Sequence, residues 1–202
     1  MRADTESTDG LAVHFALFDT AVGRCAIAWN ARGLAGVQLP EPTDALTRAR
    51  MRRRCRSAVE TAGPLPAAVQ DVIENIVALL SGERRDLSQI VLDTTGIPGF
   101  QLKVYEFARS IPAGSTRTYG QIATALGDTG SARDVGQALA QNPWPIIVPC
   151  HRVLAAGGKT GGFSAPGGTS TKIRLLAIER APNITEQLNL SLPPGEGGRA
   201  GT

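Results

Sequence analysis

The sequence predicts an α/β (α+β) fold in two parts. The first is a small N-terminal domain with an antiparallel sheet and helices. The second is a mostly helical C-terminal domain with a helix-turn-helix and a loop that carries candidate active-site residues. Apolar and polar residues alternate between turn signals over residues 11–39, as in antiparallel strands. Beyond residue 96 the apolar residues recur at helical spacing, and 202 residues suffice to bury a core in each part.

The predicted boundaries follow changes in composition along the chain. A flexible N-terminus at residues 1–10 precedes the N-terminal α/β domain at residues 11–95. The C-terminal domain, at residues 96–182, begins in the turn Gly96-Ile97-Pro98-Gly99. Residues 183–202 contain two prolines and four glycines, so we expect a disordered tail there.

The composition argues against several classes of protein. Apolar residues make up 42% of the chain, yet no run approaches the ~18 apolar residues of a membrane span. The N-terminus is acidic and lacks the pattern of a secretory signal, so we expect a cytoplasmic protein. Three widely spaced cysteines do not suggest a disulfide framework. With only two histidines beside them, we expect no metal site.

The elements of the N-terminal domain are predicted from alternation and from breakers. Three antiparallel strands are expected within residues 11–39. Helical composition covers residues 48–62, and a second helix is expected over residues 69–80, where apolar residues return every three or four positions. Residues 90–92 are a candidate for one more strand.

Six arginines fall within nine residues of a chain whose net charge is only +3. They are Arg48, Arg50, Arg52, Arg53, Arg54 and Arg56. Such a cluster is usually a solvated helix face, and contact with phosphate is the alternative. Contact with DNA or with a neighbouring copy is therefore a hypothesis for this cluster. The small net charge requires any nucleic-acid surface to be local.

The C-terminal domain is predicted to open and close with a helix. Apolar residues form a stripe over residues 100–111, which Pro112 ends. The short apolar run at residues 146–148 is expected to be buried, and six glycines within residues 157–168 predict a loop. A last helix is expected over residues 171–180.

Between these segments two short helices form a helix-turn-helix pattern. Thr118 is placed to cap a helix over residues 119–126, and Ser131 to cap a second helix that runs to about residue 141. The turn at residues 127–130 is rich in glycine and aspartate. Many helical hairpins share this pattern, so it favours DNA binding only moderately.

The candidate chemistry centres on Cys150, which His151 follows directly. A thiolate is a strong nucleophile, and a neighbouring imidazole can collect the proton of the thiol. Residues that are adjacent in sequence need not touch, so a structural cysteine beside an incidental histidine is the alternative. Because Cys150 follows a buried run and Pro149, we expect it at an exposed turn, where functional residues are common.

The residues around Cys150 closely resemble a known family. Residues 142–153 read NPWPIIVPCHRV and resemble the active-site segment of the O6-alkylguanine-DNA alkyltransferases, also called methylated-DNA–protein-cysteine S-methyltransferases. The resemblance includes TYGQIA at residues 118–123 and SARDVG at residues 131–136, and it covers residues 100–179 in all. The N-terminal half resembles the family only in outline.

The resemblance implies a catalytic role for four residues. Cys150 would accept the alkyl group, and His151 would act as a base through a water molecule. Glu179 would orient the imidazole, and Asn142 would tie the turn to the active-site segment. Together they would form a Cys/His/carboxylate arrangement of the kind found in hydrolases.

The resemblance also implies a set of contacts to the substrate base. Tyr119 would rotate the nucleotide and meet the base, while the carbonyl of Val153 would accept from the guanine amino group. Ser164 would donate to O6. Pro145 and Phe163 would line the alkyl pocket, although many relatives have tyrosine at the position of Phe163.

For DNA, the resemblance implies that the helix-turn-helix binds double-stranded DNA through the minor groove. Arg133 would fill the gap left by the flipped base, because the reactive oxygen is out of reach while the base is stacked. Gln101, Thr118 and Ser131 are further candidates for DNA contact. We expect a monomer, and the sequence leaves open whether several copies cluster along DNA.

The predicted function is direct repair of alkylated DNA, in which the alkyl group moves irreversibly and stoichiometrically to Cys150. O6-alkylguanine is the expected substrate, and O4-alkylthymine is left open. A thioether is a poor leaving group, so we expect one reaction per molecule and no cofactor. The alternatives are a lesion-binding protein of the same fold (usually with tryptophan in place of the acceptor cysteine), a transcription regulator and a cysteine hydrolase.

Overall fold

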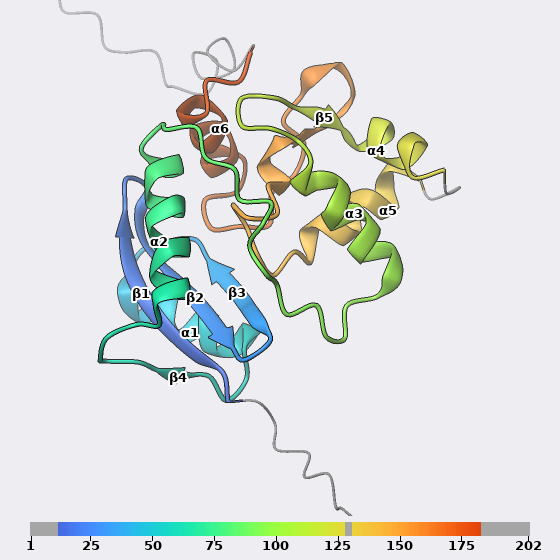
Figure 1. Cartoon of the computed structure of the whole chain (residues 1–202). Helices are drawn as coiled ribbons and strands as arrows, with labels where there is room; N and C mark the ends of the chain where they lie inside the picture. The colour runs from blue at the N-terminus through green and yellow to red at the C-terminus, as the bar shows by residue number, and fades with distance from the viewer. Residues whose placement is uncertain (1–11, 128–130, 183–202) are drawn as a thin grey trace, which may run out of the picture.

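The computed structural model describes residues 12–127 and 131–182. Within these residues a sheet with two flanking helices forms the N-terminal half, and further helices joined by loops form the C-terminal half (Figure 1). The predicted flexible N-terminus at residues 1–10 and the predicted tail at residues 183–202 lie outside the described residues. No helix among the described residues combines the length and the apolar character needed to cross a membrane.

A four-stranded sheet in the order β3-β2-β1-β4 organises the N-terminal half. β1 (His14–Thr20), β2 (Gly23–Asn30) and β3 (Gly33–Gln38) form the predicted antiparallel meander. The two-residue strand β4 (Val59–Glu60) pairs parallel to β1, so the sheet is mixed rather than purely antiparallel. β3 is an edge strand, and its free side faces the C-terminal half.

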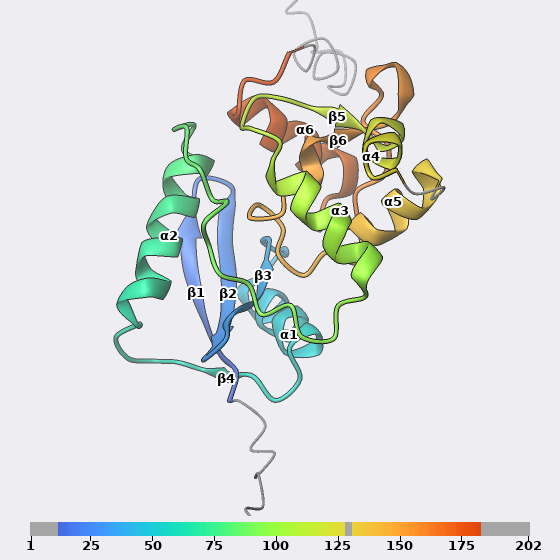
Figure 2. The same cartoon turned by 45° about the vertical axis from the view of Figure 1, so that its right-hand side comes forward.

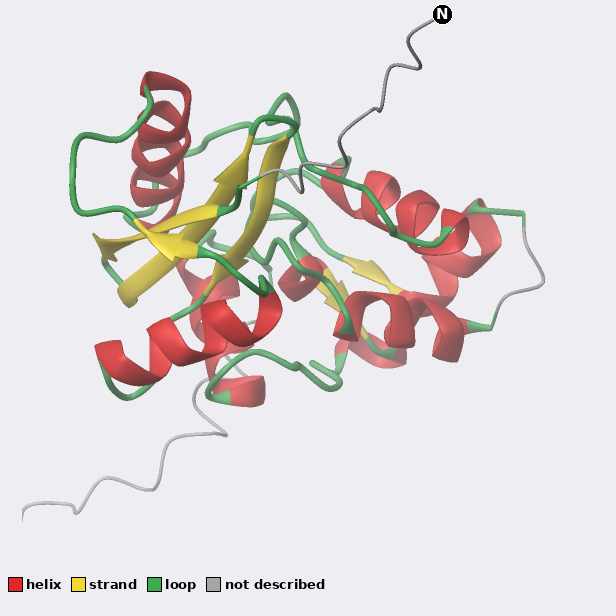
Figure 3. Ribbon diagram, turned by 90° about the horizontal axis from the view of Figure 1, so that it is seen from below, coloured by secondary structure: helices red, strands yellow, loops and turns green. Residues whose placement is uncertain are grey.

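Side chains alternate between the two faces of this sheet, and both faces are covered. Ile27 and Trp29 belong to a core shared with α2 (Ala67–Leu80). Phe15 points to the opposite face and packs with α1 (Asp44–Arg54). Figures 2 and 3 show the two helices on opposite sides of the strands. Burial of each such side chain contributes about 1.5–3 kcal/mol to stability.

Two N-terminal predictions differ from the structure. The helix expected over residues 48–62 is α1, which begins earlier because the Thr43 side chain accepts a hydrogen bond from the first turn. It ends at Arg54, and Ser57 then adopts a φ of +65°, which no α-helix can continue. The strand expected over residues 90–92 is reduced to one bridge, because only Leu92 pairs with β3.

The C-terminal half contains the predicted helices. They are α3 (Gly99–Arg109), α4 (Tyr119–Ala125), α5 (Ala132–Ala140) and α6 (Gly168–Ile178). The last of them begins three residues before its predicted start at Thr171. Most of the turn predicted at residues 127–130 lies outside the described residues.

Thr118 and Ser131 cap α4 and α5 as predicted. Each forms a reciprocal capping box, with Gln121 and Asp134 respectively at the third helical position. A short parallel pair, β5 (Arg117–Thr118) with β6 (Val153–Leu154), joins the start of α4 to the chain that follows Cys150. One apolar core includes residues from both halves, and the domain division between residues 95 and 96 stays a prediction.

Candidate active site

A tight turn between α5 and Cys150 shapes the site. The side chain of Asn142 spans this turn: its Oδ1 accepts from the backbone N–H of Trp144 at 2.9 Å, and its Nδ2 donates to the carbonyl of Val148 at 2.8 Å. The same Nδ2 lies 3.3 Å from Sγ of Cys150. One buried amide therefore closes the turn and contacts the thiol, which brings together two of the predicted catalytic residues.

The middle of this turn has a strained backbone. Ile146 has a φ of +78°, in the left-handed region that β-branched residues rarely enter. Its side chain is almost fully buried, so packing holds the conformation against a cost of about 1–3 kcal/mol. This strain lies four residues before Cys150, in a run that the sequence correctly predicts to be buried.

Cys150 begins a short 3₁₀ helix, η1 (Cys150–Arg152), and is 8% exposed. The expectation of an exposed turn is therefore wrong: the segment after residue 148 stays buried because α5, α6 and the following loop enclose it. Cys150 still reaches the surface through a cavity of about 420 Å³. The side chains that share this cavity include Tyr119, Leu139, Phe163 and Ser164.

The environment of Cys150 has opposing effects on the pKa of its thiol. Burial raises the pKa of Cys150 above its usual range. The hydrogen bond from Asn142 and the charges of Lys172 and Arg54 oppose that rise. The resting group is accordingly a thiol with polar groups placed to favour its thiolate, and it requires a base to remove the proton.

His151 and Glu179 form a buried pair beside Cys150. His151 Nε2 and Glu179 Oε1 are 2.8 Å apart, and their side chains are only 1% and 3% exposed. Burial lowers the pKa of His151, which keeps the imidazole neutral near pH 7. With Nε2–H donating to Glu179, the lone pair is on Nδ1, which has no hydrogen-bond partner among the described residues. His151 can therefore take up a proton at Nδ1.

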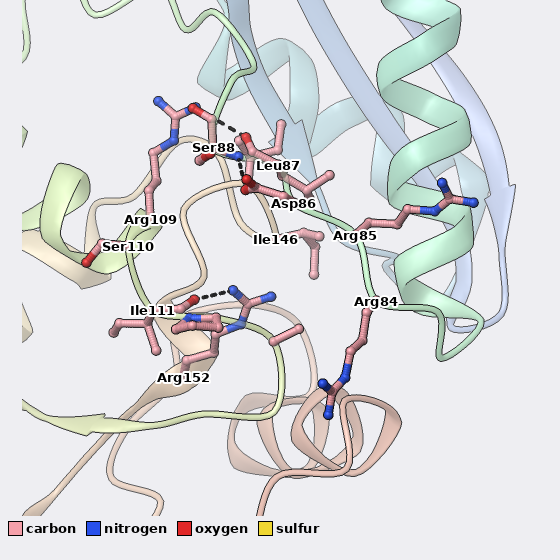
Figure 4. Close-up of a pocket in the computed structure, with 13 residues that line it drawn as sticks. Arg84, Arg85, Asp86, Leu87, Ser88, Arg109, Ser110, Ile111, Ile146 and Arg152 are labelled. Atoms are coloured by element: carbon pink, nitrogen blue, oxygen red, sulfur yellow. Dashed lines mark hydrogen bonds between the residues drawn. The ribbon is translucent and has the colours of Figure 1, made fainter.

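Arg152 holds the carboxylate of Glu179 from the other side. Its Nε and Nη2 donate to the two carboxylate oxygens at 2.9 and 2.8 Å, a bidentate pair. Its Nη1 donates to the carbonyl of Ile111 at 2.6 Å, at the wall of a rear cavity of about 520 Å³ (Figure 4). Burial alone would raise the pKa of Glu179, but His151 and Arg152 lower it to about 2.

Lys172 on α6 is a functional candidate that the sequence reasoning missed. It is fully buried, and its Nζ donates to the carbonyl of Val153 at 2.5 Å. The same ammonium lies 3.5 Å from the hydroxyl of Tyr119 and 5.6 Å from the centre of its ring. Burial lowers the pKa of Lys172 to about 8. A lysine next to Ile173 on the apolar face of α6 was the available signal.

The structure brings some of the predicted substrate residues to the cavity and places others elsewhere. Tyr119, Phe163 and Ser164 line it together with Cys150, although the Ser164 hydroxyl donates to the carbonyl of Ala140 at 3.0 Å. Pro145 reaches Cys150 through a second, much narrower cavity. The carbonyl of Val153 already accepts from Lys172, so only its second lone pair is available to a substrate.

Of the predicted DNA-contacting residues, Gln101 lies on α3 and Arg133 on α5, whereas Thr118 and Ser131 directly precede α4 and α5. Arg133, the second residue of α5, is exposed and makes no hydrogen bond or ion pair with the described residues. The hydroxyls of Thr118 and Ser131 cap their helices, and Gln101 donates to Gln141 at 2.9 Å. Their contacts with DNA stay predictions.

Comparison with known proteins identifies the class of protein to which this site belongs. The model of the DNA binding domain of 6-O-methylguanine DNA methyltransferase matches residues 99–181, which hold all the catalytic, substrate-binding and DNA-contacting candidates. The half that carries Cys150 is therefore a DNA binding domain of the 6-O-methylguanine DNA methyltransferase class.

Individual relatives extend the match beyond that domain. A methylated-DNA–protein-cysteine methyltransferase of Mycobacterium bovis is 33% identical over 169 residues, 84% of this chain and 93% of the relative. One from Methanothermobacter thermautotrophicus is 40% identical over 114 residues, 56% of this chain and 62% of the relative. A solved structure of Mycobacterium tuberculosis OGT in complex with DNA superimposes with a TM-score of 0.67 at 32% identity, covering 87% of this chain and 99% of the other. The chain belongs to the methylated-DNA–protein-cysteine methyltransferase family.

Proposed function

We propose that this protein repairs alkylated DNA directly, by moving the alkyl group from O6 of a flipped guanine to Sγ of Cys150. The observation that carries the proposal is the setting of Cys150. Its sulfur lines a cavity and lies 3.3 Å from Nδ2 of Asn142. The next residue in the chain, His151, forms a buried pair with Glu179. Family membership supports the same reaction.

DNA would be bound by α4 and α5 acting as a helix-turn-helix in the minor groove. Arg133 supports this proposal because it is exposed in the first turn of α5 without an ion pair, free to enter the gap left by a flipped base. The related Mycobacterium tuberculosis structure is a complex with DNA. Flipping is necessary because a stacked guanine keeps O6 away from a buried sulfur. We propose a cytoplasmic protein that binds DNA as a monomer. Cooperative binding to longer duplexes would show instead that several copies cluster along DNA.

The flipped base would occupy the cavity of about 420 Å³ in front of Cys150. Its size falls in the range of about 300–1,000 Å³ typical of small-molecule sites. Tyr119 forms one wall, and Gly161 and Gly136 pack against its ring. A Cβ on Gly161 would lie 3.3 Å from Tyr119, and Gly161 has a φ of +66°, so only glycine fits there without strain.

Removal of the thiol proton would fall to His151. Its Nδ1 accepts the proton, through a water molecule as the family resemblance implies, and Glu179 stabilises the imidazolium that forms. Arg152 keeps Glu179 ionised and oriented throughout. The carboxylate therefore supplies fixed negative charge and does not itself need to take up the proton.

In the transfer step the thiolate attacks the alkyl carbon, so the S–C bond forms as the C–O6 bond breaks. The electron pair of the broken bond passes to the guanine ring, which then needs one proton. Tyr119 and Lys172, whose polar atoms lie 3.5 Å apart, are placed to deliver it. The products are a thioether on Cys150 and unmodified guanine, and the thioether cannot leave, so each molecule reacts once.

A direct test follows the alkyl group out of the DNA. A duplex with one O6-methylguanine is incubated with excess wild-type protein, Cys150→Ala or Cys25→Ala, and the nucleosides are then quantified. We expect the wild type and Cys25→Ala to convert O6-methylguanine to guanine, and Cys150→Ala to bind the duplex without conversion. Conversion by Cys150→Ala would overturn the proposal, and so would a wild type that binds the lesion but leaves it intact.

A further inference from the structure

Most of the arginines clustered at residues 48–56 make contacts within the molecule. Arg48 and Arg52 pair with Glu60. Arg50 pairs with Glu41 at 3.3 Å, and its Nη2 lies 3.5 Å from the carbonyl of Ser164 in the active-site loop. Arg53 and Arg56 are exposed and make no hydrogen bond or ion pair with the described residues. The sixth arginine, Arg54, reaches the turn that carries Asn142.

Arg54 contacts three backbone carbonyls from two distant parts of the chain. Its Nη1 lies 3.0 Å from the carbonyl of Pro143, 3.1 Å from that of Val37 and 3.3 Å from that of Asn142. Val37 belongs to β3, whereas Asn142 and Pro143 begin the active-site turn. A single guanidinium from the N-terminal half therefore joins the edge of the sheet to the backbone of a predicted catalytic residue.

We propose that Arg54 is a positioning residue for Cys150, through which α1 and β3 of the N-terminal half hold Asn142 against the sulfur. The proposal rests on the proposed function for its effect on alkyl transfer. Asn142 is the link, because Arg54 contacts its backbone carbonyl while its side chain contacts Cys150. A shift of that backbone would move the amide away from the sulfur.

The contacts around Arg54 show that this junction is closely fitted. The N–H of Val37 donates to the carbonyl of Pro143 at 2.9 Å, and the indole N–H of Trp144 donates to the carbonyl of Leu34 at 2.7 Å. The turn thus occupies the free edge of β3 around Val37, next to the point where Leu92 pairs with Leu34. Gly36 makes the approach possible: a Cβ there would lie 3.3 Å from Sγ of Cys55 and 3.5 Å from the Pro143 carbonyl.

Arg54 and Cys150 also face a common space. Both line a small cavity of about 20 Å³, close to the ~10–15 Å³ that a single water molecule requires. Burial raises the pKa of the Cys150 thiol, and Arg54 is one of the charges that lower it. Arg54 is therefore placed to favour the thiolate by its charge as well as by its hold on Asn142.

The test compares three variants on the same helix. Arg54→Met removes the donors and the charge, and Arg54→Lys keeps the charge but loses the planar fork. Arg53→Met is the matched control, because Arg53 is exposed like Arg54 but makes no hydrogen bond or ion pair with the described residues. Met and Lys have helix propensities close to that of Arg, so α1 is preserved. Three readouts are needed: the single-turnover rate of methyl transfer at saturating duplex, the affinity for that duplex, and the pH profile of Cys150 alkylation by iodoacetamide, followed on its peptide.

We expect Arg54→Met to slow transfer by about tenfold or more, since displacement of reacting groups by about 1 Å costs about a hundredfold. Its alkylation profile should move to higher pH, while its affinity for the duplex stays unchanged. Arg54→Lys should keep the wild-type pH profile and transfer at an intermediate rate. Arg53→Met should match the wild type in all three readouts.

The opposite results are equally clear. An Arg54→Met variant with the wild-type rate and pH profile would overturn the proposal, as would a loss confined to DNA affinity or an equal loss in Arg53→Met. If Arg54→Met does not unfold cooperatively, Arg54→Lys decides, and a wild-type transfer rate in that variant overturns the proposal. The iodoacetamide profile needs no alkylated DNA, so it tests positioning even if the wild type transfers no methyl group.

Discussion

Two buried cysteines show how differently the halves of this molecule treat the same side chain. Cys25 on β2 is fully buried among apolar residues, and burial raises its pKa to about 12, with only Thr20 acting to lower it. Cys150 is almost as buried, yet Asn142, Lys172 and Arg54 all act to lower its pKa. Burial alone makes a thiol inert, whereas burial among fixed polar groups prepares it for reaction.

The same contrast extends to the other side chains that each half buries. The N-terminal half buries mainly apolar side chains, with Gln38 and Thr47 as its buried polar ones, whereas the C-terminal half buries several charged and polar side chains. These are Asn142, His151, Arg152, Lys172 and the side chain of Glu179. Buried charges cost stability unless every partner is present, so the C-terminal half should be the more sensitive to the loss of one partner.

The largest effect on stability is expected from Glu179→Gln. It leaves the charge of Arg152 buried without its carboxylate, so we expect the free energy of unfolding to fall by about 3–5 kcal/mol. Urea denaturation measures this, with Glu106→Gln on an exposed side of α3 as the control. A loss below about 1 kcal/mol, the value for an exposed pair, would show that the C-terminal charges are not interdependent.

Acid should act on the same carboxylate. Because the pKa of Glu179 is lowered to about 2 in the folded protein, its contribution is complete above the unfolded value of about 4.3 and is lost as pH falls toward 2. The loss amounts to about 3 kcal/mol. The pKa of His151 is lowered for a different reason, its burial, so stability should begin to fall below about pH 6.5. Urea melts between pH 7 and pH 2 should show both phases, and in Glu179→Gln the lower one should disappear.

Arg133→Ala should separate binding from folding. Arg133 is exposed and makes no hydrogen bond or ion pair among the described residues, so stability should be unchanged. Affinity for a duplex with O6-methylguanine should fall about tenfold, or ~1.4 kcal/mol. Arg84→Ala, at an exposed arginine outside α4 and α5, is the control. Equal losses of affinity in the two variants would remove the special role of α5.

The smallest effect is expected at the wall of the cavity. Gly161→Ala introduces a Cβ 3.3 Å from Tyr119 at a φ of +66°, so we expect a loss of about 1 kcal/mol. Gly162→Ala is a matched control, because a Cβ there has no neighbour within 4 Å and its φ is not positive. Thermal unfolding distinguishes the two variants, and it is the only readout compared because Gly162 also lines the cavity in front of Cys150. Identical behaviour would mean that the Tyr119 ring does not depend on Gly161.

The elements that could be predicted from the sequence are those that local sequence patterns specify. Apolar spacing located α2 and α3, and side chains of the capping type located the starts of α4 and α5. The boundaries of α1 were mispredicted because its arginines provide no apolar period and because Thr43, outside the basic run, caps it. The burial of Cys150 was missed because it depends on packing by segments distant in sequence.

The residues of the site also divide into those that the sequence predicts and those that only the structure reveals. The resemblance at residues 142–153 identified Cys150, His151 and Asn142, and the structure brings Glu179 to His151 across 28 positions of sequence. Lys172 and Arg54 were not predicted, because each acts through backbone carbonyls, which no side-chain pattern reveals. Side-chain contacts to backbone carbonyls distant in sequence have to be observed in three dimensions.

The most direct test of the account is peptide mass spectrometry of the wild-type protein after incubation with an excess of duplex that contains one O6-methylguanine. The account predicts one methyl group per chain, located on the peptide with Cys150, and none on the peptides with Cys25 or Cys55. Methylation at another residue, or several equivalents of lesion consumed per chain, would contradict it.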